Sequence, residues 1–473
     1  MDKILRLKVF WIFLSVYLIL YIVTCKNGFF WDTTHLASLQ AWWFYDNDFK
    51  YFFLPPDIDS GHPPFFAMVL ASLWKIFGVH LIVGHTMMLP FTMILISQVI
   101  LVSRYYFKEN LQWVVALILC NPVVLGQSTL VSPDIVLFGF FLFTFHGVIT
   151  NNGFKIILGA VILCALSMRG MMCAGLFYLF SLFRNGLSLR TIFKWGYLFL
   201  PGFILAMLFL LLHYRQTGWV GYYPGSPWAP SFEKVDITGF FRNIVVFVWR
   251  MVDMGMIFMW VFLGYAILLQ IRQSRYPDKR TKELLILWLI CFTLSVLPQF
   301  FYSQLLMHRY LLPLVAITTY IFYSLAQECR NRSLLRKLSL LALVGLISGN
   351  LWVFPDSIAK GWDATLAHLP YYKLRKEALH FIKEKNIPLG NVNGGFPYNL
   401  TGKCIDLNSD TATFSKLPPE ESPYVLYSNI TNDYTDQQLH SFKEDWVPLK
   451  KFGGWPVRFV LYKNPSFVSE SQH

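Results

Sequence analysis

The chain has 473 residues, of which 55% are hydrophobic and only 14% are charged, and its formal net charge is +13. Soluble domains carry about 25% charged residues, so this composition excludes an ordinary soluble protein and indicates a membrane protein. The positive charge does not indicate nucleic-acid binding, because the sequence has no basic block with interleaved aromatic residues and much of the excess lies in short loops between apolar runs.

Apolar runs long enough to cross a hydrocarbon layer of about 30 Å recur through residues 1–354. We expect about eleven transmembrane helices there, and hence a multi-spanning α-helical membrane domain. Lys and Arg are roughly twice as frequent in the loops on one side of these runs, which places the N-terminus in the cytoplasm by the positive-inside rule. The expected spans lie near 8–24, 84–103, 111–127, 134–150, 155–168, 171–183, 195–213, 252–271, 284–301, 309–327 and 338–354.

Two segments on the expected outer side are unusually long, residues 25–83 and 214–251. The first contains a further apolar stretch at 63–78, PPFFAMVLASLWKIFG, which begins with two prolines and includes a lysine. Proline is tolerated in the first turn of a helix, so we interpret this stretch as an interfacial or re-entrant helix. The second segment is rich in aromatic residues, Pro and Gly, and long ordered loops of this kind are usually functional.

Residues 355–473 differ from the rest of the chain. They have an ordinary density of charged residues, a helix-like run at 373–386, and the strand-like stretches YVLYSNI and VRFVLYK. We therefore expect a small α/β domain here. An odd number of spans after a cytoplasmic N-terminus places this domain on the extracytoplasmic face.

Asp32 follows the first apolar run in the stretch FFWDTTHLAS, and two interpretations of it are open. Aspartate is a strong N-cap, so Asp32 could begin a helix through THLASLQAWWFY. At the mouth of a cleft it could instead act as a general base, because partial burial raises the pKa of a carboxyl group toward a useful range. His35 would share a helix face with Asp32 and is a candidate accessory residue.

A divalent metal ion is compatible with the first outer segment. Asp32, Asp59 and His62 could converge on a cation, because carboxylates and imidazole are suitable ligands. Their spacing does not require a metal, so the metal question is open at this point, and the sequence indicates no other cofactor.

Several cations lie on the expected outer side, against the positive-inside trend. Arg169 interrupts an apolar run, His308 and Arg309 begin another, and Arg250 follows VVFVW. Arginine near a span needs a partner or a function, and a single arginine can pair with an outer carboxylate or reach lipid phosphates. Several together indicate an outward-facing anion site, because guanidinium geometry suits phosphate.

Asp134 begins an apolar run directly after a proline, in SPDIVLF. We expect it to cap the helix that starts there, and an accessory role in the site is the alternative. The sequence shows no glycine-rich phosphate loop, no Ser-His-Asp signature and no zinc motif.

Taken in order, these pieces resemble the GT-C-fold glycosyltransferases that use polyprenyl-phosphate sugars, specifically the aminoarabinose transferase and protein O-mannosyltransferase-like branch (glycosyltransferase family 39-like). The resemblance covers roughly residues 1–327. In that branch a second acid usually follows the first, where this chain has Thr33. The elements that carry the resemblance are WDTTHLAS, GHPPFFAMVL, LWKIFG, SPDIVLFGFFLF, MRGMMCAGLFYL and HRYLLPLVA.

The resemblance implies an integral-membrane glycosyltransferase with Asp32 as the carboxylate that activates the acceptor. The implied partners are a polyprenyl-phosphate-linked sugar donor, membrane lipids, and a lipid, glycan or protein acceptor. Candidate contacts to the donor phosphate, from the family motifs or from the pattern of outer cations, are His62, Arg169, Arg309, His308 and Arg250.

Two other classes of function are compatible with the sequence. A transporter or flippase for lipid-linked saccharides would favour inverted repeats and ionisable residues near the middle of the membrane, and neither is evident. A non-catalytic membrane assembly protein would bind partners through residues 355–473. A stable complex with a partner that is unaffected by changes at Asp32, Arg169 and Arg309 would distinguish that protein from an enzyme.

Overall fold

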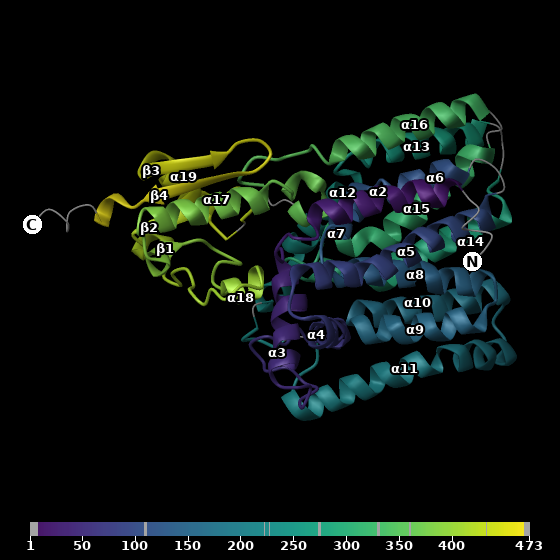
Figure 1. Ribbon diagram of the computed structural model, residues 1–473. Helices are drawn as coiled ribbons and strands as arrows, with labels where there is room; N and C mark the ends of the chain where they lie inside the picture. The colour runs from purple at the N-terminus through teal and green to yellow at the C-terminus, as the bar shows by residue number, and fades with distance from the viewer. Residues whose placement is uncertain are drawn as a thin grey trace, which may run out of the picture.

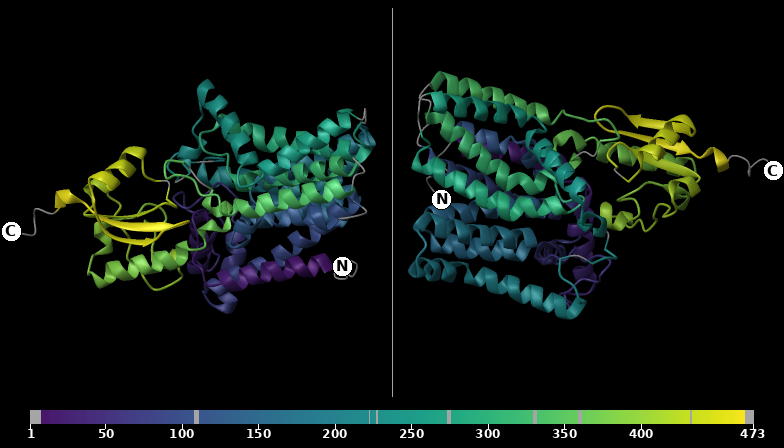
Figure 2. Two further views of the ribbon diagram at one scale, coloured as in Figure 1. Left: turned by 90° about the horizontal axis from the view of Figure 1, so that it is seen from above. Right: turned by 180° about the vertical axis from the view of Figure 1, so that it is seen from behind.

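The computed structural model describes residues 8–107, 111–221, 223–226, 228–272, 276–328, 332–358, 361–431 and 433–467. The fold is mostly helical, with a small sheet near the C-terminus. Long helices lie side by side in a bundle, and the sheet lies beyond one end of that bundle (Figure 1). Two further views show the same separation between the bundle and the sheet (Figure 2).

The helices of the bundle follow the apolar runs of the sequence. Several begin at a Ser, Asn or Asp whose side chain accepts a hydrogen bond from a backbone N–H of the first turn, as Asn152, Ser167 and Ser188 do. The bundle helices are α2 (Lys8–Thr24), α5 (Leu81–Tyr106), α6 (Leu111–Leu119), α8 (Pro133–Ile149), α9 (Gly153–Leu166), α10 (Met168–Asn185), α11 (Leu189–Thr217), α13 (Ile257–Arg272), α14 (Lys279–Cys291), α15 (Leu312–Glu328) and α16 (Arg332–Gly349).

The environment of the helices is that of an integral membrane protein. Helix α8 is buried along nearly its whole length, whereas α11 at the edge of the bundle is largely exposed (Figure 1). The exposed side chains of α11 include Leu200, Ile204 and Leu208. An apolar surface of this extent is typical of a face that contacts lipid.

The helices that are long and apolar enough to cross a membrane, each by itself, are fewer than the expected spans among the described residues. Four helices, namely Leu81–Tyr106, Leu189–Thr217, Lys279–Phe301 and His308–Gln327, are long and apolar enough to cross a membrane. Two bent pairs raise the number to six among the described residues. The multi-spanning helical class is confirmed. Fewer helices than the eleven expected spans meet this criterion of length and composition, because several of the expected spans are short or bent helices.

The two bends have local causes. The first breaks the expected span at 111–127 by 58°, where Pro122 begins α7 (Pro122–Ser128) and Asn121 caps it. The second, of 90°, separates α12 (Ile237–Val252) from α13, where Gly255 has a positive φ. The last part of the expected outer loop 214–251 is helical, because α12 begins at Ile237.

The first outer segment folds across the end of the bundle. It contains a π-helix η1 (Thr34–Leu39), α3 (Gln40–Asp46) and α4 (Phe65–Phe77). Helix α4 begins directly after Pro64 and lies within the stretch for which the sequence predicts a short helix. It is seen end-on in Figure 1, where the bundle helices run across the view, so α4 lies across the bundle helices.

The C-terminal part contains a four-stranded sheet between two helices. The strand order is β1-β2-β4-β3, with β1 and β2 parallel and the other pairs antiparallel. Side chains alternate along β4, so Leu461 packs toward α17 and Tyr462 packs toward α19. The elements are α17 (Tyr371–Glu384), β1 (Val392–Asn393), α18 (Gly402–Ile405), β2 (Tyr424–Ser428), α19 (Asp436–Glu444), β3 (Val447–Gly453) and β4 (Arg458–Lys463).

The C-terminal part contacts the first outer segment closely. The backbone N–H of Phe29 donates to the carbonyl of Ile405 at 2.8 Å, and Trp42 Nε1 donates to the carbonyl of Lys403 at 3.1 Å. A Cβ at Gly28 would lie 2.7 Å from that same Ile405 oxygen, so no larger residue fits there. These contacts hold the loops of the C-terminal part over the end of the bundle.

Candidate functional site

A cavity of about 980 Å³ lies where these segments meet. Its walls come from five parts of the chain: the first outer segment, the start of α10, the second outer segment, residues 304–310 before α15, and the loops of the C-terminal part. The lining residues used below are Trp31, Asp32, His35, Leu36, Asp57, Ser60, His62, Arg169, Trp228, Arg309, Tyr310, Gly395, Phe396, Lys416 and Asp433.

Arg309 is the centre of an ionic cluster at one side of this cavity. Its Nη2 contacts Asp32 Oδ2, its Nη1 contacts Asp363 Oδ2, and its Nε lies 3.3 Å from Asp134 Oδ2. The Arg309 side chain is only 8% exposed. Because each of its nitrogens faces a carboxylate, the direct phosphate contact expected of Arg309 does not fit this geometry. Its planar guanidinium instead holds three carboxylates at fixed positions.

Asp32 does not cap a helix. The N-cap position of η1 is Thr33, and its side chain makes no capping bond. Thr33 Oγ1 donates to the carbonyl of Phe30 at 2.7 Å and accepts from the N–H of Phe30 at 2.9 Å, which closes a turn. The capping interpretation of Asp32 is therefore wrong, and its carboxylate points to Arg309 and the cavity.

The backbone next to Asp32 and the pKa of Asp32 are both unusual. The preceding residue, Trp31, has a φ of 49°, a conformation that a bulky residue rarely adopts and that is often found at functional sites. Burial raises the pKa of Asp32 above its ordinary value, although the neighbouring Arg309 acts in the opposite direction. Asp363 and Asp134 add to the increase, because a further negative charge on Asp32 is unfavourable beside them.

Asp134 does not cap the helix that it was expected to cap. Ser132 is the N-cap of α8, and its Oγ accepts from the N–H of Asp134. The Asp134 carboxylate instead contacts Arg169 Nη2 at 2.5 Å and the Nε of Arg309 at 3.3 Å. The ionic cluster thus contains three carboxylates and two guanidinium groups, an excess of one negative charge.

Arg169 and His62 lie on a second side of the cavity. The Arg169 guanidinium stacks 3.8 Å from the ring centre of Tyr310, and a quarter of its side chain is exposed. His62 Nδ1 is buried and has no hydrogen-bond partner among the described residues. Burial lowers the pKa of His62 to about 4, so its ring is neutral at neutral pH.

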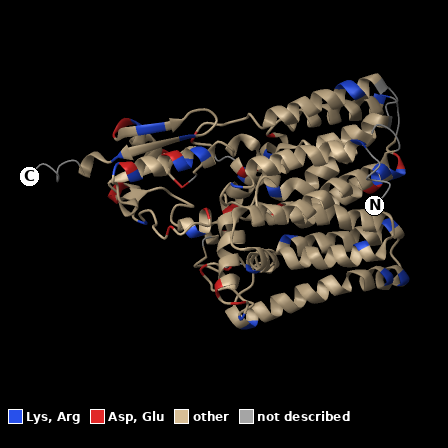
Figure 3. Ribbon diagram, viewed as in Figure 1, with Lys and Arg blue, Asp and Glu red and all other residues tan. Residues whose placement is uncertain are grey.

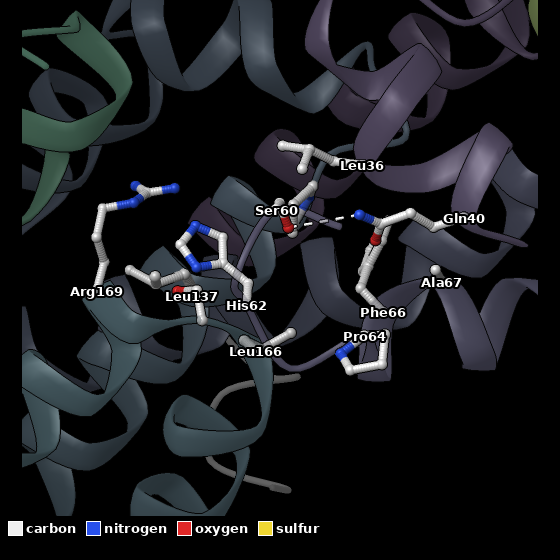
Figure 4. Close-up of a pocket in the computed structure, with 12 residues that line it drawn as sticks. Leu36, Gln40, Ser60, His62, Pro64, Phe66, Ala67, Leu137, Leu166 and Arg169 are labelled. Carbon is white, nitrogen blue, oxygen red and sulfur yellow. Dashed lines mark hydrogen bonds between the residues drawn. The ribbon is translucent and has the colours of Figure 1, made fainter. Parts of the chain in front are cut away.

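A narrow extension of about 30 Å³ joins the main cavity at these residues. The two spaces share Leu36, Ser60, His62 and Arg169. Figure 4 shows His62 beside the Arg169 side chain, with the hydrogen bond from Gln40 to Ser60 nearby. The other side chains around this extension are mainly apolar and include Phe66, Leu137 and Leu166.

His308 and Arg250 do not line the cavity. His308 Nε2 lies 3.0 Å from Asp253 Oδ2, and Arg250 Nη1 lies 3.8 Å from the same oxygen. A Cβ at Gly361 would lie 2.6 Å from His308 Nδ1, so the chain before η6 (Trp362–Ala364) covers the histidine. The predicted phosphate role does not fit either residue, because both belong to a separate buried cluster.

Asp59 is also placed apart from Asp32. Its Oδ2 lies 2.9 Å from His213 Nε2, and its Oδ1 accepts from the N–H of Gly61 at 2.8 Å. The pair joins the first outer segment to α11. Among the described residues, no group of three His, Cys, Asp or Glu side chains could hold a metal ion. The three residues that could have converged on a cation, Asp32, Asp59 and His62, form no such group among the described residues.

His35 lies at the other end of the cavity, between two aromatic rings. Its ring centre is 5.4 Å from those of Trp228 and Phe396, which come from the second outer segment and the C-terminal part. Phe396 also packs edge to face against Trp31 at 5.5 Å. His35 shares the cavity with Asp32, but no hydrogen bond between the two side chains occurs.

The sequence interpretation missed Asp363 and Gln127. Gln127 Nε2 donates to Asp363 Oδ2 at 2.9 Å and to its backbone carbonyl at 3.0 Å, while Gln127 Oε1 accepts from Ser132 at 2.6 Å. Asp363 belongs to a segment with ordinary charge density, so no local pattern distinguishes it. Gln127 carried a usable signal, because it is a polar residue at the end of an apolar run.

Comparison with known proteins identifies the fold. No protein-family model and no curated protein matches the chain. The structure is similar to that of ArnT from Cupriavidus metallidurans bound to undecaprenyl phosphate, with a TM-score of 0.52 and 11% sequence identity, over 96% of this chain and 97% of that one. This chain has the fold of ArnT. The GT-C fold that the sequence motifs predict is therefore confirmed.

Two weaker similarities complete the comparison. ArnT from the same organism in the apo state gives a TM-score of 0.49 at 11% identity, over 96% of this chain and 97% of that one. An Archaeoglobus fulgidus oligosaccharyltransferase, in complex with Zn and sulfate, gives a TM-score of 0.36 at 15% identity, over 72% of this chain and 53% of that one.

Proposed function

We propose that this protein is a membrane glycosyltransferase that moves a sugar from a polyprenyl-phosphate donor to an acceptor. The observation that carries the proposal is the cavity in which Asp32, held by Arg309, faces the same space as Arg169 and His62. The ArnT structure with the same fold is bound to undecaprenyl phosphate, which supports a lipid of this class as the donor here.

The donor phosphate fits best at Arg169 and His62. Arg169 keeps part of its guanidinium exposed beside the cavity, whereas Arg309 is enclosed by carboxylates. The neutral His62 can donate one hydrogen bond to a phosphate oxygen from the buried Nδ1 that lacks a protein partner. The apolar side chains around the small extension beyond them suit contact with the first part of a polyprenyl chain.

Asp32 is proposed to activate the acceptor. Its carboxylate takes the proton of an acceptor hydroxyl as the oxygen attacks the anomeric carbon of the donor sugar. The bond between that carbon and the phosphate oxygen breaks, and the lipid phosphate leaves with the electron pair against Arg169. A positioned base of this kind contributes about 10²- to 10⁴-fold to the rate. Arg309 is a positioning residue, because it fixes the Asp32 carboxylate and opposes the rise in its pKa that burial causes.

The proposed location of this chemistry is the extracytoplasmic face. Figure 3 shows Lys and Arg in most of the charged positions at the end of the bundle where the N-terminus lies, with a few Asp and Glu among them, and both signs of charge over the C-terminal part. Positive charge collects on the cytoplasmic side of membrane proteins, so the N-terminus is proposed to be cytoplasmic and the region of residues 355–473 to be extracytoplasmic.

The test is donor turnover by the full chain in lipid nanodiscs. Undecaprenyl-phosphate hexoses and pentoses are supplied, and release of undecaprenyl phosphate is followed by mass spectrometry. Asp32→Asn is expected to lower the rate by about 10²-fold or more, because an amide cannot accept the proton. Asp48→Asn is the matched control, since Asp48 is an exposed residue of the same segment paired with Lys75. Full turnover by Asp32→Asn would contradict the proposal.

A further inference from the structure

The two ends of the cavity differ in chemical character. The end at Arg169 and His62 adjoins the apolar extension between the bundle helices. The other end is formed by His35, Trp228 and Phe396, here called the His35 cluster, which comes from η1, the second outer segment and the C-terminal part. No side chain of the His35 cluster lines the apolar extension, so this cluster faces a part of the cavity away from the proposed lipid path.

The His35 ring is prepared for a ligand. Its side chain is only 7% exposed, and its Nδ1 has no hydrogen-bond partner among the described residues. His35 lines the cavity, and a buried polar atom without a partner costs free energy, so an unpaired imidazole nitrogen at this position favours a ligand that hydrogen-bonds to the ring. The rings of Trp228 and Phe396, at 5.4 Å, fix the orientation of His35 without occupying its Nδ1.

The position of Phe396 is also fixed. Its backbone N–H donates to Asp433 Oδ2. The preceding Gly395 has a φ of 64°, and a Cβ there would lie 2.7 Å from the same carboxylate oxygen. The loop that carries Phe396 is therefore held close to Asp433, which brings an aromatic ring of the C-terminal part to the cavity wall.

The chemistry of the His35 cluster favours a neutral ligand. Burial lowers the pKa of His35 to about 4, so the ring does not offer a positive charge to a phosphate. The charged residues that line the whole cavity balance, with Asp32, Asp57 and Asp433 against Arg169, Arg309 and Lys416. The cavity therefore has no net positive charge to attract an anionic acceptor.

A pyranose ring meets these requirements. One face of such a ring carries C–H groups that pack on aromatic side chains, and its edge carries hydroxyl groups that bond to a neutral imidazole. We propose that the His35 cluster is an acceptor subsite for a neutral saccharide ring, whose free hydroxyl is directed to Asp32. This inference rests on the proposed transferase function and specifies its acceptor as a glycan hydroxyl rather than a phosphate or a peptide.

The first experiment measures how acceptors change donor turnover. The full chain in nanodiscs receives an undecaprenyl-phosphate hexose together with a methyl hexopyranoside, glycerol phosphate or a serine-containing peptide. The methyl hexopyranoside is expected to accelerate release of undecaprenyl phosphate and to form a disaccharide glycoside. In His35→Phe and Trp228→Ala, the KM for the glycoside is expected to rise by about tenfold, and more than the KM for the donor, because one hydrogen bond or one ring contact is lost.

Two further variants separate the specific effect from misfolding. His35→Asn places an amide near the position of Nδ1 and is expected to recover part of the affinity that His35→Phe loses. His440→Phe makes the same substitution at an exposed histidine of α19 and is expected to leave both KM values unchanged. An equal loss of affinity in His35→Asn and His35→Phe would overturn the hydrogen-bonding role of His35.

The second experiment detects saccharide binding without the donor. Saturation-transfer difference NMR with a methyl hexopyranoside is expected to show contact in the wild type and a weaker signal in His35→Phe. Contact that depends on His35, with no donor turnover under any condition, would refute the proposed transferase and leave the saccharide subsite standing. Donor turnover accelerated by glycerol phosphate or the peptide, with no glycoside contact, would overturn the subsite and leave the transferase standing.

Discussion

The side chains of two adjacent residues, His308 and Arg309, belong to two different buried ionic clusters. Arg309 holds three carboxylates, those of Asp32, Asp134 and Asp363, and the cluster lines a cavity. On the other side, His308 shares the single carboxylate of Asp253 with Arg250 in a cluster that does not reach the cavity. The difference indicates two roles for buried charge. An excess of carboxylates that lines a cavity can take part in chemistry, whereas a buried cluster with compensated charge and no access to a cavity holds elements together.

The strongest test of this distinction is Arg309→Lys. A lysine is a single compact charge and cannot face three carboxylates in fixed directions, so Asp32 loses its orientation. Turnover of an undecaprenyl-phosphate sugar is expected to fall by about 10²-fold or more. Arg242→Lys is the control, because Arg242 contacts the carbonyl of Ser303 outside this cluster. Equal turnover in the two variants would show that the geometry around Arg309 does not matter for chemistry.

The cluster of Asp253, His308 and Arg250 is expected to respond in the opposite way, with a larger effect on stability than on turnover. Asp253→Asn removes the carboxylate that balances Arg250 and accepts from His308, and its side chain is 1% exposed. Loss of one partner from a buried pair costs about 3 kcal/mol, so the Tm of the purified protein should fall clearly. Turnover per folded molecule should change much less than in Arg309→Lys. A collapse of turnover with an unchanged Tm would reverse the assignment of the two clusters.

Asp363→Asn sharpens the comparison within the open cluster. The charge of Asp363 contributes to the raised pKa of Asp32, so its removal should lower that pKa. Asp32 must be ionised to act as a base, and activity is therefore lost as pH falls through its pKa. The acidic limb of the pH–rate profile is expected to move to lower pH in Asp363→Asn, with a loss of about tenfold or less at neutral pH. A limb that stays in place would mean that Asp32 is not the titrating base.

The smallest expected effect concerns stability at low pH. Burial lowers the pKa of His62 to about 4, below the value of about 6.5 expected for an unfolded histidine. The unfolded chain then binds a proton more readily than the folded one, so this histidine lowers stability as pH falls from about 6.5 toward 4. His62→Gln should reduce the decrease in Tm over this range. His440→Gln, at an exposed histidine, should leave that decrease unchanged.

Much of the fold follows from local sequence. The apolar run at 8–24 coincides with α2 (Lys8–Thr24), and the stretch after two prolines is α4 (Phe65–Phe77), because apolar length and proline position act within a few residues. The bends were not predictable, because a run such as 111–127 is continuous in sequence although its helix bends by 58° at Pro122. Apolar length and periodicity indicate that a segment is helical, but they do not show where the helix axis changes direction.

The site was only partly predictable for a physical reason. The candidates Asp32, Arg169 and His62 were recognisable as polar residues in apolar surroundings, and the structure places all three on one cavity. Their partners were not recognisable, since Asp363 reaches Arg309 from 54 residues away and Arg309 reaches Asp32 from 277 residues away. Adjacent charges such as His308 and Arg309 look alike in sequence, although their side chains enter different clusters.

The order of the ionic partners along the chain has a consequence for biosynthesis. Asp32 is made soon after translation begins, but its guanidinium partner follows 277 residues later, and Asp363 comes last. A ribosome that is still making the bundle therefore holds a chain in which the Asp32 carboxylate has not yet met its partners. Only when the C-terminal part has emerged and contacted the first outer segment at Ile405 is the cavity complete. The ionic cluster and the cavity thus form only when synthesis is nearly finished, and a product truncated before Asp363 cannot form them.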